Sequence, residues 1–134
     1  MALLPDVGTF LAANVTDTAL TQGTNLFLGR MPETPDTCVS VYQTAGRAPT
    51  DVFGGDTAPP IENPGLMIHV RAVAYSDCQA LAEDVMKTLS KVINEALSGT
   101  TYYKVAAVQS PFALDRDDKD RMVFSCNFDV TRVL

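Results

Sequence analysis

The chain has 134 residues, 46% of them hydrophobic, which suffices for one compact core and excludes a disordered polymer. Sixteen acidic residues against ten basic ones give a formal charge of −6, which disfavours tight binding to nucleic acid. No uncharged stretch approaches the ~20 apolar residues of a transmembrane helix, and the start lacks the basic region of a secretory signal. The sequence therefore predicts one soluble, intracellularly made domain over residues 1–134, with no membrane contact.

The first elements predicted are a helix and two short strands. Residues 5–16 place apolar side chains at helical spacing after Pro5, which suits a first helical turn. Residues 25–29 predict a short strand that ends at the turn MPETPD, and residues 37–44 predict a second strand with alternating polarity.

A long loop is then expected over residues 46–64, GRAPTDVFGGDTAPPIENP, which are rich in glycine and proline. A structureless connection of this length is uncommon in a compact domain and is typically functional or disordered. Because a solvated loop has little use for apolar side chains, we interpret three of its residues as candidate interface positions: Val52, Phe53 and Ile61.

Residues 65–75 form the strongest predicted strand, and its two faces differ. Leu66, Ile68, Val70, Ala72 and Ala74 alternate onto a core face. The opposite face is amphipathic and suits solvent or another protein, which adds three candidate interface residues: Met67, His69 and Arg71.

A long helix should follow from Ser76, an expected N-cap with Gln79 three residues on, to about Leu97, before Gly99. Its apolar stripe is expected to include Leu81, Ala82, Val85, Leu89, Val92, Ile93 and Ala96. Residues 102–110 and 121–133 predict the last two strands, joined by the polar hairpin PFALDRDDKD.

The order helix, strand, strand, loop, strand, helix, strand, strand predicts an α+β fold. We expect a mixed, mostly antiparallel sheet of four to five strands with two helices packed on one face. The three cysteines are odd in number, widely spaced and set among apolar residues, so we expect reduced, buried thiols at Cys38, Cys78 and Cys126.

No motif for catalysis, a cofactor or a metal emerges. His69 is the only histidine, and no Gly-x-Ser-x-Gly elbow or Cys-x-x-Cys pair accompanies it. An EF-hand loop that began at Asp115 would place Lys119 at its fifth position and Cys126 at its twelfth, so that motif fails, although a looser carboxylate cation site stays open. We predict no enzyme, no catalytic residues, no cofactor and no metal.

Three stretches together resemble a known family: LFLGRMPETPDTCVSVYQTAGRAP (26–49), GLMIHVRAVAYSD (65–77) and PFALDRDDKDRMVFSCNFDV (111–130). In this order they are similar to the minor capsid, or tail terminator (tail completion), proteins of long-tailed bacteriophages. The shared features are Pro-x-x-Pro-Asp before a strand, a strand ending in Val-Arg, and an Asp-rich hairpin before Asn-Phe.

The resemblance implies a ring, typically of six subunits, that caps the completed tail tube and joins it to the head. Its implied partners are further copies of the chain, the tail tube protein and a neck or head-completion protein, while genomic DNA passes through the lumen without specific binding. The implied location is the head–tail junction of the virion, after assembly in the bacterial cytoplasm.

Three other functions stay open at this point. The first is a head-completion or stopper role in the neck. The second is a small ligand-binding domain or enzyme, with His69, Arg71 and the acidic hairpin around a pocket. The third, which the charge disfavours, is a nucleic-acid-binding module.

Overall fold

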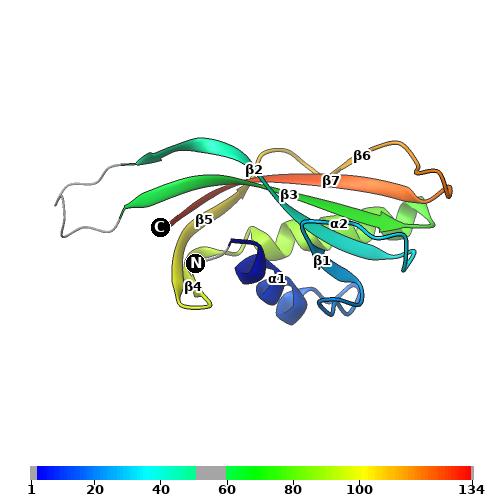
Figure 1. Cartoon of the computed structure of the whole chain (residues 1–134), viewed down its shortest axis with the longest axis horizontal. Helices are drawn as coiled ribbons and strands as arrows, with labels where there is room; N and C mark the ends of the chain where they lie inside the picture. Colours follow the sequence, from blue (N-terminus) through cyan, green and yellow to red (C-terminus); the bar gives the residue numbers. More distant parts are fainter. Residues whose placement is uncertain (1–2, 51–59, 134) are drawn as a thin grey trace.

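The computed structural model describes residues 3–50 and 60–133, which form two helices and seven strands (Figure 1). The helices are α1 (Leu3–Asn14) and α2 (Tyr75–Leu89). The strands are β1 (Leu26–Leu28), β2 (Cys38–Thr50), β3 (Ile61–Ala72), β4 (Ile93–Leu97), β5 (Thr100–Ala107), β6 (Phe112–Ala113) and β7 (Met122–Val133). Helix α1 begins two residues earlier than expected, which still leaves Pro5 in the first turn, where its missing N–H costs nothing.

The strands form one mixed sheet in the order β1-β2-β3-β7-β5-β4, with β6 paired to β7. Only β1 and β2 pair in parallel, so the prediction of a mostly antiparallel sheet is confirmed. The predicted count of four to five strands is wrong, because β4 and β6 form from segments expected to be a helix end and a hairpin tip.

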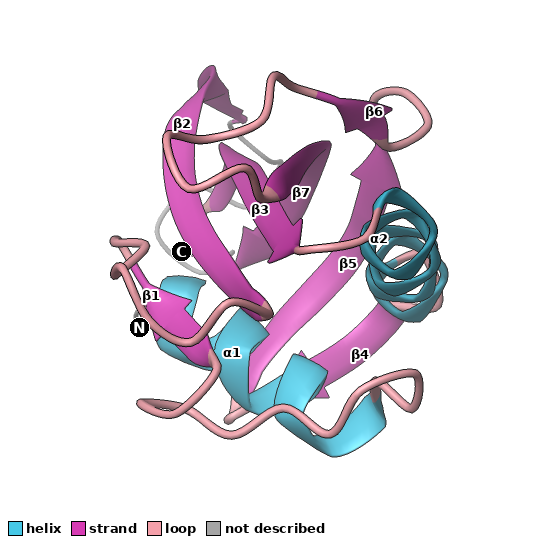
Figure 2. Cartoon of the chain, turned by 90° about the vertical axis from the view of Figure 1, so that its right-hand side faces the viewer, coloured by secondary structure: helices cyan, strands magenta, loops and turns pink. Residues whose placement is uncertain are grey.

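Both helices pack into one hydrophobic core on the concave side of the sheet. Seen end-on, the sheet is strongly curled, and α1 lies across its open side against β1, β2 and β4 (Figure 2). Helix α2 packs mainly on β3 and β7. The largest fully buried side chains of this core include Tyr102, Phe124, Phe128, Leu11, Leu26, Leu66, Ile68, Leu81 and Leu89.

The expected helix to Leu97 is wrong, because the chain leaves α2 after Leu89 and returns as the β4–β5 hairpin. Ser98 and Gly99 both have positive φ, 50° and 86°, as the two-residue turn of a tight hairpin requires. The apolar stripe is therefore buried only as far as Leu89 and Val92, and Ile93 is 59% exposed in β4. The expected cap also differs, since α2 begins after Ala74 with no capping side chain.

The expected loop over residues 46–64 is also wrong at both ends, because β2 and β3 continue into it as a projecting antiparallel arm (Figure 1). Two register shifts lie between Thr44 and Thr50. A side chain on Gly46 would come within 1.9 Å of the Asn63 carbonyl oxygen, so only glycine fits this crossing. The Asn63 side chain donates to the Ala48 carbonyl (2.9 Å) and the Thr50 hydroxyl (3.0 Å), which fastens the strands where their ladder is irregular.

A buried polar network ties α1 to the far end of the sheet. Tyr102 donates its hydroxyl to Asp6 (2.8 Å) and accepts from Arg132 (2.9 Å), and Arg132 also pairs with Glu62 from the arm. Burial, together with the Asp6 carboxylate, raises the pKa of Tyr102 to about 12. The phenol therefore stays protonated and keeps its donor role across the neutral range.

All three cysteines are free and buried, as predicted. Burial raises the pKa of Cys78 to about 11 and that of Cys126 to about 12, and it raises the pKa of Cys38 as well. These thiols act as small apolar core groups. Among the helices of the described residues, none has the length and apolar character needed to span a membrane.

Candidate functional site

Among the described residues no helix covers the convex face of the sheet, and three of the candidate interface residues lie on that face. Three rows of side chains cross it over β2, β3 and β7: Tyr42, Met67 and Asn127; Ser40, His69 and Ser125; Cys38, Arg71 and Val123. The structure thus brings Met67, His69 and Arg71 onto one face, and the predicted division of this strand into a core face and an outer face is confirmed.

The same rows continue onto apolar side chains beyond the other edge of β7. Val108 donates its backbone N–H to Asn127, Phe112 pairs with Ser125, and Leu114 donates its backbone N–H to Val123. Val108 is 57% exposed, Phe112 38% and Leu114 37%. Together with the half-buried Met67, we call these residues the outer patch. Of its members the sequence analysis named Met67 alone, because Val108 fell in a predicted strand with no face assigned and Phe112 and Leu114 fell in a predicted connection.

His69 lies in the middle one of the three rows, between Ser40 and Ser125. Its ring meets the ring of Tyr42 edge-on at 5.4 Å, and burial lowers its pKa. Within residues 3–50 and 60–133 it makes no ion pair, so no carboxylate orients it as a general base. It also lines none of the four grooves found around α1, the β4–β5 turn and the outer side of α2.

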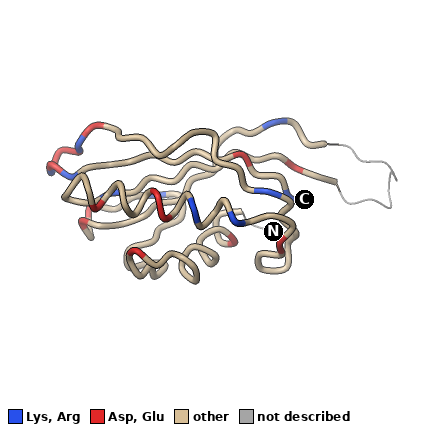
Figure 3. The backbone as a smooth tube through the Cα atoms, turned by 180° about the vertical axis from the view of Figure 1, so that it is seen from behind, with Lys and Arg blue, Asp and Glu red and all other residues tan. Residues whose placement is uncertain are grey.

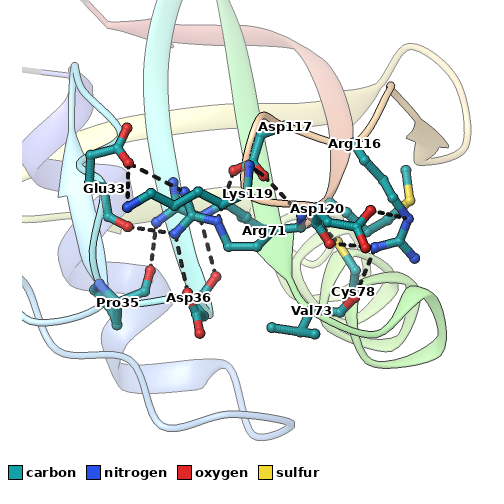
Figure 4. Close-up of polar contacts among 12 residues, drawn as sticks. Glu33, Pro35, Asp36, Arg71, Val73, Cys78, Arg116, Asp117, Lys119 and Asp120 are labelled. Carbon is teal, nitrogen blue, oxygen red and sulfur yellow. Dashed lines mark hydrogen bonds and ion pairs between the residues drawn. The ribbon is translucent and has the colours of Figure 1, made fainter.

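Arg71 differs from the expectation of a solvent-facing or partner-facing charge, because its side chain is buried and bonded within the chain (Figure 4). Its guanidinium donates to the carbonyl oxygens of Pro35 (2.5 Å) and Asp36 (3.2 Å). The hydrophobic stem lies among buried strands, and the charge is satisfied by the turn before β2. Its described contacts thus hold the turn in place.

A second buried arginine, Arg121, joins the same turn to the connection before β7. It pairs with Asp117 at 2.8 Å and Asp36 at 3.3 Å, and it donates to the Glu33 carbonyl oxygen at 2.5 Å. Lys119 adds an ion pair to Glu33 at 2.9 Å. We call this set the charged clamp: Glu33, Asp36, Asp117, Lys119 and Arg121. Acidic and basic segments gather at the end of the molecule away from the arm (Figure 3).

The charged clamp includes part of the acidic hairpin in which a carboxylate cation site had stayed open as a hypothesis. Burial alone would raise the pKa of Asp117, but hydrogen bonds from Arg121 and Lys119 outweigh it and hold that pKa below the usual value. Both Asp117 oxygens are thus engaged by donors of the chain. Over residues 3–50 and 60–133, no three acidic, histidine or cysteine side chains gather as a metal site would require.

The charged clamp makes stability depend on pH in a defined direction. Lys119 lowers the pKa of Glu33, and the pKa of Asp117 is lowered as described, so both carboxylates stabilise the fold above their usual values of 4.5 and 3.8. This contribution is lost as the pH falls through the lowered folded-state values. Between about pH 6 and pH 3, we expect the free energy of unfolding, measured with urea, to fall further for the wild type than for Asp117→Asn. Equal losses in the two proteins would contradict the assignment.

The remaining candidate residues belong to the arm. Ile61 begins β3, where it pairs with Thr50 on one side and Val133 on the other, and it is half-buried. Val52 and Phe53 lie outside the described residues. From Gln43 to Thr50 every residue of β2 is exposed. The described part of the arm therefore presents a long polar strand where a loop was predicted.

The comparisons with known proteins agree with this architecture. The family profile described as "Bacteriophage tail terminator protein" matches residues 11–134. A solved structure titled "Virion of native gene transfer agent (GTA) particle" contains a chain with a TM-score of 0.73 and 20% identity, over 99% of this chain and 96% of that one. No curated protein matches. Since the family match spans nearly the whole sequence, including both strands of the arm and the charged clamp, the chain belongs to the bacteriophage tail terminator family, whose members are structural proteins of the virion.

Proposed function

We propose that this protein is a tail terminator that assembles into a ring, and that the ring caps the tail tube and joins it to the neck. The ring we propose has six subunits, the number that the family resemblance implies. The observation that carries the proposal is the family match over residues 11–134. The projecting arm supports it, since an exposed strand on an otherwise compact domain suits contact with another subunit.

The charge of the chain supports the proposed passage of DNA through the ring. Each copy carries −6, so a ring multiplies this charge and repels the phosphate backbone. Genomic DNA then slides through the lumen without being held. The proposed site is the head–tail junction, with the tail tube protein on one side and a neck or head-completion protein on the other, assembled in the host cytoplasm.

The test is to image the purified protein by electron microscopy at high concentration, alone and with isolated tail tubes. Rings, free or seated on tube ends, are expected. A protein that stays monomeric at every concentration and leaves tube ends bare would overturn the proposal. Recovery on DNA-filled heads rather than on tails would assign the head-completion role instead.

The arm's geometry gives a variant that separates assembly from folding. We expect Gly46→Val to abolish ring formation, because its side chain collides with the Asn63 backbone and must displace one strand of the arm. The core does not include this residue, so circular dichroism and the midpoint of thermal unfolding should change little. Gly23→Val is the control, because Gly23 is exposed and far from the arm. A Cβ atom at this position would meet no other atom within 4 Å, and its φ of 85° adds only local backbone strain. Rings formed by Gly46→Val at the wild-type concentration would contradict this role of the arm.

A further inference from the structure

The strand edges that lack a neighbour within the described residues include one on β2 and one on β4. Strand β1 covers β2 only from Val39 to Val41, so the outer edge of β2 is open from Gln43 onward. At the other end of the sheet, β4 pairs with β5 alone. Unpaired strand edges are templates for pairing with another strand, and natural proteins either guard them or use them.

The open edge of β2 points its backbone groups away from β3. Val39 donates its N–H to Asn25 (2.9 Å) and Val41 accepts from Gly29 (2.7 Å), so odd-numbered residues here turn toward the β1 side. Because a strand alternates, the N–H and C=O of Gln43 turn the same way, past the last residue of β1. Pro49 has no N–H and sets a limit to pairing along this edge.

Strand β4 lines a groove beside α1. The groove has a volume of about 270 Å³ and lies between α1 and the β4–β5 turn. Helix α1 lines it with Thr9, Phe10 and Ala13, and β4 lines it with Glu95, Ala96 and Leu97. A groove between a helix and a free strand edge is the geometry in which proteins accept an added strand, with backbone hydrogen bonds for affinity and side-chain pockets for register.

The two edges carry opposite charges that are exposed to solvent. Arg47 is exposed and is the only charged residue from Gln43 to Thr50. Glu95 is exposed in β4 and is the only charged residue of that strand. Neither makes an ion pair within residues 3–50 and 60–133. Because both side chains are exposed, Arg47 and Glu95 can each pair with a charge on another copy.

The lengths of the two edges also match. At roughly 3.3 Å per residue, residues 43–48 of β2 span at most about 20 Å and the five residues of β4 at most about 17 Å, because a register shift in β2 and the positive φ of Asn94 in β4 shorten both. A closed ring needs a head-to-tail contact between two different surfaces of each copy. One edge supplies the added strand, and the other supplies the groove.

We propose that residues 43–48 of one copy add as a strand to the free edge of β4 in the next copy, seated against α1, with Arg47 beside Glu95. This inference rests on the proposed ring and names the contact that builds it. The exposed Ile93 lies on the same strand as Glu95, and the arriving arm would reduce its contact with water.

The test is a charge exchange across the contact. Arg47→Glu and Glu95→Arg are made singly and together, with Arg30→Glu as the matched control on an exposed arginine outside both edges. Light scattering gives the concentration at which half the protein is assembled, and circular dichroism reports folding. We expect each single variant to raise that concentration at least about tenfold, and the double variant to return it to within about threefold of wild type.

The other outcomes separate this contact from the ring itself. If both single variants form rings at the wild-type concentration, the proposed contact is overturned and the ring itself still stands. That is the result expected if Arg47 is only a hydrated charge on the strand edge. Single variants that form normal rings but no longer cap tubes place the arm on the tube protein, and that also overturns it. A double variant that assembles no more readily than the single variants also overturns the proposed contact. Wild-type protein that never assembles overturns both proposals.

Discussion

Arg132→Met should lower the free energy of unfolding by about 3 kcal/mol. Arg132 is 6% exposed and pairs with Glu62, and it also holds Tyr102 against Asp6. Methionine fills similar space but leaves two carboxylates from different elements without their cation. Removing one partner of a buried pair typically costs about 3–5 kcal/mol, and the low end applies because Glu62 keeps partial contact with water.

Urea unfolding of wild type and variant measures this loss. Arg47→Met is the control, since it removes an exposed arginine from the same sheet and should change stability by less than about 0.5 kcal/mol. The double variant Arg132→Met with Glu62→Gln should recover part of the loss, because one stranded carboxylate is then gone. Equal stability of Arg132→Met and Arg47→Met would show that the network does not tie α1 to the sheet.

Leu89→Asp should leave the chain unfolded at room temperature. Leu89 is fully buried at the last turn of α2. Truncating a buried leucine costs about 2–5 kcal/mol, and a carboxylate without a partner in the core adds several more. The total approaches the whole stability of a small domain, which is on the order of 5–15 kcal/mol.

Circular dichroism and exposure of the buried thiols to a thiol reagent report this collapse. Ala80→Asp carries the same charge on the exposed side of the same helix and should stay folded. In the folded control all three cysteines react slowly, because each is buried. Rapid thiol reaction in both variants would mean that α2 is more weakly docked than its buried residues indicate.

The core of the fold follows from the sequence pattern because alternation and helical spacing report burial directly. The face of β3 with Leu66, Ile68 and Val70 is buried as expected, and so is the stripe of α2 through Leu89. Beyond Leu89 the same apolar spacing continues by chance into β4, and Gly99 serves a hairpin turn as well as it would a helix end. The Ser98-Gly99 pair is a turn signal that favours the hairpin.

The strands of the arm could not be predicted, for a different reason. Residues 44–50 have few β-branched side chains and include Gly46 and Pro49, so local propensity favours a loop. Long-range partners make the strand: Asn63 bonds across two irregularities, and β7 flanks β3 on its other side. The burial of Arg71 and Arg121 likewise depends on carbonyl groups of a turn more than thirty residues away.

The place of β7 in the sheet constrains the order in which the molecule can form. Residues 122–133 are the last strand in sequence, yet they lie in the middle, between β3 on one side and β5 and β6 on the other. Until a nascent chain has released them from the ribosome, β3 and β5 have no neighbour to join them, and the sheet is two separate pieces. A chain that lacks these residues therefore cannot complete the sheet, whatever its other strands have already formed.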